Sequence, residues 1–153
     1  MQWLEHKVPP PVVAAVVGLA MWGVAPHGPT FALDPLARYG IAGVLFAIAL
    51  AFDLSGLLAF RAKRTTINPL APQRASALVT GGVYRVTRNP MYVGLCFILL
   101  AWTVYLSALL PIIGPIFFIA YVTRFQIVPE ERVLRRLFGN AYLQYAQRVR
   151  RWL

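Results

Sequence analysis

A basic, glycine-punctuated segment meets a strongly apolar one in the stretch of residues 83–94, VYRVTRNPMYVG. Asn89 is a residue type that caps helices and Pro90 suits a first helical turn, so we predict that a helix starts here. A second helix start is predicted at residues 129–132, Pro-Glu-Glu-Arg, where two acids stand among arginines. We expect these two helix ends to meet at one membrane surface and to hold a charged small molecule.

The composition is that of an integral membrane protein. Mean hydropathy is +0.62 and 59% of the 153 residues are hydrophobic, which is too apolar for an ordinary soluble domain. Fifteen Lys and Arg oppose five acids, which gives a formal net charge of +10. The arginines cluster at the ends of apolar segments, so we attribute the charge to topology and lipid headgroups and expect no nucleic acid partner. A single cysteine, Cys96, excludes an intramolecular disulfide, and two histidines exclude a His-rich metal site.

The apolar segments predict an all-α integral membrane fold with about four transmembrane helices in one domain, residues 1–153. The predicted spans are at about residues 10–26, 39–60, 91–110 and 112–128. Pro111, Gly114 and Pro115 predict a tight reversal, so we expect the last two spans to form a helical hairpin. A cleaved signal peptide is the alternative for the first apolar segment, because its basic flank and short length also suit one.

Positive charge is concentrated in a polar link at residues 61–88 and in a tail at residues 129–153, whereas residues 94–122 contain no Lys or Arg. By the positive-inside rule, both termini and the link face the cytosol, and the shortness of the chain suggests a prokaryotic inner membrane. Apolar residues recur at helical spacing in the tail and are interrupted at Gly139-Asn140. The tail is therefore predicted to be an amphipathic helical segment along the cytosolic headgroups.

Charged residues at or inside the spans each have two explanations. Asp53, inside the second span, either faces a partner or wet cavity, or extends to the headgroups. Arg124, near the end of the fourth span, either neutralises Asp53 or a glutamate, or likewise extends to the headgroups. Glu130 and Glu131 are favoured by the helix dipole without any ligand. The alternative is that this pair of acids binds a cationic group of a ligand.

Four motifs occur in a fixed order: residues 65–69 (TTINP), 78–85 (LVTGGVYR) and 88–94 (RNPMYVG), then Glu130-Glu131 followed by Leu134, Phe138-Gly139, Tyr142 and Tyr145. Over residues 65 to 153 this order resembles the superfamily of isoprenylcysteine carboxyl methyltransferases and phospholipid methyltransferases. The chain departs from it at Asn89, where the eukaryotic enzymes commonly carry His. Asparagine donates and accepts hydrogen bonds but does not titrate near neutral pH, which weakens an acid or base role for this position.

The resemblance implies an integral membrane enzyme that uses S-adenosylmethionine, bound at the cytosolic side between the last spans and the C-terminal segment. This cofactor carries a sulfonium, an ammonium and a carboxylate, so a site with both acids and arginines suits it. We expect Glu131 to hold the ammonium or the ribose hydroxyls, and Arg88 to hold the carboxylate. The expected cofactor-binding residues are Tyr84, Arg88, Asn89, Tyr92, Gly94, Glu131 and Tyr142.

Methyl transfer depends mainly on aligning the nucleophile, the methyl group and the sulfur, so it needs few catalytic side chains. Glu130 is the candidate base or orienting group for the acceptor, and Arg124 is the candidate for binding an acidic group on it. We expect membrane lipids as partners and a hydrophobic small-molecule or lipid-like acceptor that enters laterally from the bilayer. The alternatives are a nicotinamide-dependent membrane reductase, because sterol reductases resemble this superfamily in their last spans, and a non-catalytic small membrane protein.

Overall fold

The computed structural model describes residues 5, 7–63 and 76–153, and every regular element in this part of the chain is a helix. The all-α prediction therefore holds for the described residues, whereas the motif at residues 65–69 lies outside them. The α-helices are α1 (Pro10–Val24), α2 (Pro35–Ala62), α3 (Pro90–Leu106), α4 (Ile113–Val122) and α5 (Val128–Arg148). Four shorter elements join them: η2 (Ala25–His27), η4 (Gly82–Arg85), η5 (Leu110–Ile112) and the π-helical segment η6 (Thr123–Ile127).

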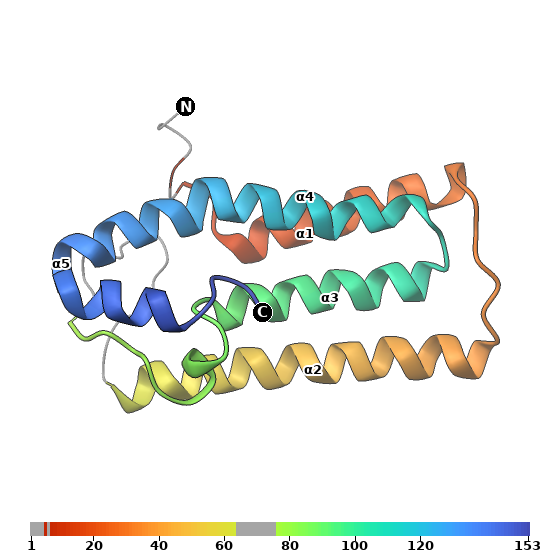
Figure 1. Cartoon of the computed structure of the whole chain (residues 1–153). Coiled ribbons are helices and arrows are strands. Elements are labelled where there is room, and N and C mark those ends of the chain that lie inside the picture. Colours follow the sequence, from red (N-terminus) through yellow and green to blue (C-terminus); the bar gives the residue numbers. More distant parts are fainter. Residues whose placement is uncertain (1–4, 6, 64–75) are drawn as a thin grey trace.

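The first four α-helices run side by side along one direction, with α3 between α2 and the pair formed by α1 and α4 (Figure 1). Among the described residues, three helical stretches are long and apolar enough to cross a membrane: Pro10–His27, Pro35–Ala62 and Leu110–Arg148. The α3 helix is apolar but shorter, at 17 residues. Each of the four predicted spans thus coincides with an apolar helix, and α3 and α4 form a hairpin.

The α2 helix starts one turn earlier than predicted because the sequence provides a start signal there. Asp34 occupies the N-cap position and its carboxylate accepts a hydrogen bond of 3.1 Å from the backbone N–H of Ala37. Pro35 follows at the first helical position, where its missing N–H costs nothing. At the same end of the bundle, the two connecting loops pair through an isolated bridge between Thr30 and Ala108.

The C-terminal tail is not the separate surface helix that the sequence predicted. The helix of α4 continues through η6 into α5, so Pro129 lies inside a continuous helical stretch and does not start a new one. The wider π-helical turn of η6 comes immediately before this proline, which lacks an N–H and crowds the preceding turn. The predicted interruption is present at Gly139, whose φ of 48° reverses the chain so that the end of α5 folds back (Figure 1).

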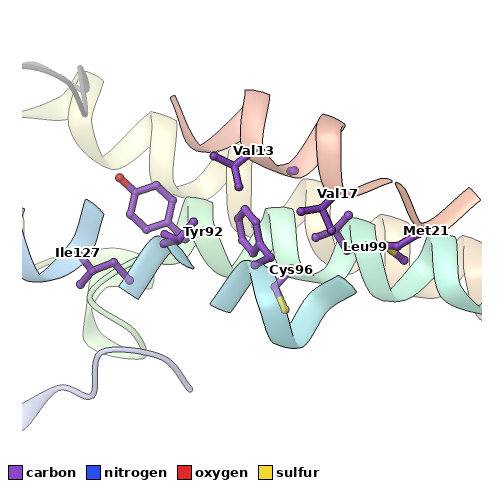
Figure 2. Close-up of a cluster of buried hydrophobic side chains, with 10 residues drawn as sticks. Val13, Val17, Met21, Tyr92, Cys96, Leu99 and Ile127 are labelled. Carbon is purple, nitrogen blue, oxygen red and sulfur yellow. The ribbon is translucent and has the colours of Figure 1, made fainter. Parts of the chain in front are cut away.

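An apolar core joins α1, α3 and α4. Its buried residues include Val13, Val17 and Met21 from α1, and Tyr92, Cys96 and Leu99 from α3 (Figure 2). Phe118 of α4 is fully buried among them. Figure 2 shows that the hydroxyl group of Tyr92 points away from this cluster, toward the end of the bundle where α3 begins. We call this end, formed by the start of α3, η4 and α5, the basic end.

Candidate functional site

Glu131 is the centre of a cluster of charged side chains at the basic end. Its side chain is only 8% exposed, and two arginines share its carboxylate. Arg88 Nη2 lies 3.1 Å from Oε1, while Arg151 donates from Nε to Oε1 over 3.0 Å and from Nη2 to Oε2 over 2.8 Å. The hydrogen bonds to Glu131 raise the pKa of Arg151. The predicted pair Arg88 and Glu131 is therefore brought together, with a second arginine that the sequence analysis did not select.

Arg88 is held on several sides but keeps one donor unused. Its Nη1 donates to the Tyr142 hydroxyl over 3.0 Å, and its guanidinium lies 6.0 Å from the centre of that ring. Its backbone N–H donates to the carbonyl of Arg150 over 3.0 Å. The side-chain Nε is buried and has no hydrogen-bond partner among the described residues. A buried N–H without a partner is costly, so this atom is a position where an acceptor from a ligand is favoured.

Glu130 has a different set of partners from its neighbour. The Tyr92 hydroxyl donates to its two carboxylate oxygens over 3.1 and 3.2 Å, and Gln126 Nε2 lies 3.4 Å from Oε1. Consecutive residues of an α-helix are rotated by about 100°, so the two acids face separate groups. Tyr92 is thus placed with the candidate base, not beside Arg88 and Glu131. Gln126 was not selected from the sequence, although its position one turn before Glu130 is a signal for such a contact.

Residues 149–153 cross the start of α3 and form a C-terminal strap. The backbone carbonyl of Arg151 accepts from Asn89 Nδ2 over 2.9 Å and from Thr87 Oγ1 over 3.2 Å. Trp152 Nε1 donates to Thr123 Oγ1 over 3.1 Å, which ties the strap to η6. The predicted capping role of Asn89 is wrong: it occupies the N-cap position, but its side chain makes no capping hydrogen bond and holds the strap instead.

Tyrosines of η4 and α5 close the cluster on the side of the folded-back helix. The Tyr145 hydroxyl donates to the backbone carbonyl of Tyr84 over 2.7 Å, and the Tyr84 ring meets Phe60 of α2 edge-on. Burial, together with the neighbouring Tyr145 and the carboxylate of Glu130, raises the pKa of the Tyr84 phenol above its ordinary value. Tyr142 thus lies beside Arg88, and Tyr84 contacts the folded-back end of α5 through Tyr145.

Two predicted site residues have other surroundings. A Cβ on Gly94 would collide with the Asp53 carboxylate and with the backbone carbonyl of Ala49, so this glycine lets α2 and α3 approach closely. Arg124 is 52% exposed and forms an ion pair of 3.3 Å with Glu5. Of the alternatives for Arg124, the structure has the pairing with a glutamate, Glu5, and not with Asp53. Glu5 also pairs with Arg132, so it carries two arginines as Glu131 does.

An apolar groove with a volume of about 940 Å³ lies between α1 and α2, over α3. Its walls carry small residues, including Ala14 and Gly18 on one side and Ala42 and Gly43 on the other. Its floor includes Leu95, Leu99 and Trp102 of α3. These floor residues are spaced three or four apart and continue the helical stripe that begins at Tyr92. The Tyr92 hydroxyl donates a hydrogen bond to Glu130. On α3 the lining of the groove thus starts at Leu95, one turn beyond Tyr92.

Comparison with known proteins identifies the family of the chain. A family model described as phospholipid methyltransferase matches residues 37–141, which include the start of α3 and the glutamate pair of α5. The chain belongs to the phospholipid methyltransferase family, a class of membrane methyltransferases. This confirms the superfamily that the motifs had predicted.

Two curated proteins are similar to parts of the chain. An uncharacterized protein of Haemophilus influenzae is 49% identical over 63 residues, which make up 41% of this chain and 100% of that protein. Protein-S-isoprenylcysteine O-methyltransferase B of Arabidopsis thaliana is 43% identical over 77 residues, which make up 47% of this chain and 36% of the Arabidopsis protein. No solved structure matches the chain.

Proposed function

We propose that this protein is an integral membrane enzyme that transfers a methyl group from S-adenosylmethionine to a hydrophobic, lipid-like acceptor. The observation that carries the proposal is the cluster of Arg88, Glu131 and Tyr142; Arg88 and Glu131 lie within the region that matches the family, and Tyr142 directly follows it. A second polar group, Glu130 with Tyr92, lies beside it, and the lining of the apolar groove on α3 starts at Leu95, one turn from Tyr92. The same protein thus offers a charged site, a separate carboxylate and a hydrophobic channel.

The chemistry of these side chains fits the amino-acid part of the cofactor. The unpaired Nε of Arg88 is a buried donor that suits a carboxylate, and charge-assisted hydrogen bonds of this kind are the strong ones. Glu131 is a buried acceptor that suits an ammonium group or ribose hydroxyls. Tyr84, Asn89 and Tyr142 surround this pair, and we keep them as cofactor contacts. Gly94 remains a predicted contact as well, although its packing against α2 explains it without a ligand.

When bound, S-adenosylmethionine supplies an electrophilic methyl group, so the chain has to hold the acceptor in line and exclude water. Glu130 is our candidate for accepting a proton from the acceptor, or for orienting it. Tyr92 and Gln126 fix the direction of its carboxylate through three hydrogen bonds. Arg124 keeps its predicted role toward an acidic group on the acceptor, which requires that it leave Glu5.

The groove provides a place for the hydrocarbon part of the acceptor. Its lining is almost entirely apolar and it is open along the side of the bundle, where a lipid chain has direct access. Because its floor runs along α3 toward Tyr92, a chain in the groove has its polar end directed toward Glu130. We therefore infer that the acceptor reaches the site from the bilayer, between α1 and α2.

The distribution of charge supports the predicted orientation. Exposed arginines of α5, such as Arg132, Arg135 and Arg136, gather at the basic end. By the positive-inside rule, we place this end and both termini at the cytosolic surface, where a water-soluble cofactor is available. For a bacterial chain this is the inner membrane.

Binding of S-adenosylhomocysteine, measured by calorimetry on detergent-purified protein, tests the proposal. We expect saturable binding by the natural sequence and a loss of at least about tenfold in affinity for Glu131→Gln, because a charged hydrogen bond is worth about 1.5–3 kcal/mol. Glu5→Gln is the matched control, since it removes another acid shared by two arginines but outside the cluster. Equal affinities for both variants and the natural sequence would refute the assignment of Glu131. Absence of any binding by folded protein would favour the reductase or the non-catalytic alternative.

A further inference from the structure

Arg151 binds the Glu131 carboxylate, the group that we assign to the cofactor's ammonium. Its guanidinium contacts both oxygens of Glu131, and Oε1 also receives Arg88. In this arrangement each oxygen of the carboxylate already accepts at least one charged donor. Three of the roughly four acceptor sites of the carboxylate are therefore taken, and an ammonium group that makes more than one hydrogen bond to Glu131 has to displace an arginine.

Arg151 is the arginine whose side chain is free to leave. Its side chain is 36% exposed, so water can replace Glu131 as its partner, whereas the Arg88 side chain is only 12% exposed and is also bound to Tyr142. The strap itself does not depend on the Arg151 guanidinium. Its backbone is held by Asn89 and Thr87 through the Arg151 carbonyl. The side chain can therefore move away while the strap stays in place.

We propose that Arg151 is a built-in competitor of the cofactor: its guanidinium holds Glu131 in position while the site is empty and is displaced when an ammonium group binds. The inference rests on the proposed function, because it assigns Glu131 to the cofactor's amino group. It adds a regulatory element within the same site. If the ligand binds only the state in which Arg151 is displaced, its apparent affinity is reduced by the fraction of molecules in that state. Removing the Arg151 guanidinium restores the full affinity.

The test compares Arg151→Gln with Arg150→Gln. The two variants lose the same charge at adjacent positions, but the structure records ion-pair contacts with Glu131 for Arg151 and only a backbone contact for Arg150. We expect Arg151→Gln to bind S-adenosylhomocysteine about tenfold more tightly than the natural sequence, as for a competitor that occupies the site nine-tenths of the time. Arg150→Gln is expected to leave that affinity unchanged.

Methylthioadenosine separates competition from a general structural effect. It has the adenosine and sulfur of the cofactor but no ammonium or carboxylate, so its affinity should be the same in the natural sequence and in Arg151→Gln. Tighter binding of both ligands, or weaker binding of S-adenosylhomocysteine by Arg151→Gln, would overturn the proposal. If Arg151→Gln does not fold, Arg151→Lys replaces it, because a lysine cannot make the same two-point contact and should also tighten binding.

This experiment keeps the two hypotheses apart. If Glu131→Gln has no effect on S-adenosylhomocysteine binding, the proposed function of Glu131 fails and the role of Arg151 fails with it. If Glu131→Gln weakens binding and Arg151→Gln weakens it as well, the proposed function stands. Arg151 is then a direct contact of the cofactor and not its competitor.

Discussion

Two adjacent acids at the start of α5 differ in their partners, and this difference assigns them different chemistry. Glu131 is bound by two guanidinium groups, which are charged donors. Glu130 is bound by a phenol and an amide, which are neutral donors. A carboxylate with neutral partners is free to accept a proton without breaking an ion pair. On these contacts we propose Glu130 as the base and Glu131 as the binding group.

The substitution Glu130→Gln tests this division of roles. The amide has nearly the same size, so the helix and the strap should remain folded, while the group can no longer accept a proton. If an amine or phenol is the acceptor, we expect methyl transfer to slow by about 10²–10⁴, the usual contribution of a general base. The affinity for S-adenosylhomocysteine should be unchanged, because Glu130 lies outside the Arg88 and Glu131 cluster. The measured kcat tests the expected slowing of methyl transfer, and calorimetry tests the expected unchanged affinity for S-adenosylhomocysteine.

Tyr92→Phe is the companion variant for this prediction. It removes the hydroxyl that orients Glu130 but leaves the carboxylate, so kcat should fall less than for Glu130→Gln. An unchanged kcat for Glu130→Gln with an acceptor that must lose a proton would exclude the base. A loss of cofactor affinity equal to that of Glu131→Gln would show that the two acids act as one group.

Among the described glycines between α2 and α3, Gly94 has the closest contacts across the two helices. Helices in membranes associate through close contact between small residues, because lipid provides no hydrophobic force between them. Gly94 faces the Ala49 carbonyl and the Asp53 side chain, which leaves no room for a methyl group. Since Arg88 lies just before α3 and Tyr92 lies in its first turn, the distance of α3 from α2 also sets the position of these side chains.

The substitution Gly94→Ala is therefore expected to destabilise the protein by about 1–3 kcal/mol, the usual cost of an overpacked contact. Gly40→Ala in α2 is the matched control, because a Cβ there meets nothing within 4 Å. That variant should be neutral or slightly stabilising, since alanine favours a helix more than glycine does. Thermal unfolding in one detergent compares the two. A Gly94→Ala protein as stable as Gly40→Ala would show that α2 and α3 separate without cost.

The helical segments could be predicted from the sequence, but the side-chain contacts between them could not. Apolar length located the four helical segments, and Pro90 and Gly139 marked a helix start and a reversal that the structure contains. The helix start predicted at Pro129 was wrong, because a π-helical turn before a proline allows the helix to continue. No residue type in the sequence indicates such a turn. Arg151 was missed because nothing distinguishes it locally from Arg148 or Arg150. Its role follows from a contact with Glu131, 20 residues away, that exists only after the chain reverses at Gly139.

For the whole molecule, the arrangement separates a polar end from an apolar side. The charged residues of the site, Arg88, Glu130, Glu131 and Arg151, come from the turn before α3, from α5 and from the strap, all at the basic end, whereas the groove is formed by α1, α2 and α3 along the bundle. On the proposed function, a water-soluble cofactor and a membrane-soluble acceptor approach the protein from two different phases. The packed helices of the bundle separate the polar basic end from the apolar groove.

This separation predicts that the groove can be blocked without affecting the cofactor site. Gly43 lines the groove and a Cβ there meets nothing within 4 Å, so Gly43→Phe should fold and fill part of the groove with its ring. Gly40→Phe is the control, since Gly40 is equally open, lies one turn earlier on α2 and is not part of the lining.

Bilayers containing a phospholipid with a diazirine in its acyl chain provide the probe, and mass spectrometry locates the labelled residues. We expect Gly43→Phe to reduce labelling of α1 and of the α3 floor while S-adenosylhomocysteine affinity stays the same, and Gly40→Phe to change neither. Equal labelling of both variants would mean that lipid chains do not enter between α1 and α2, and the acceptor would then have to reach Glu130 by another route.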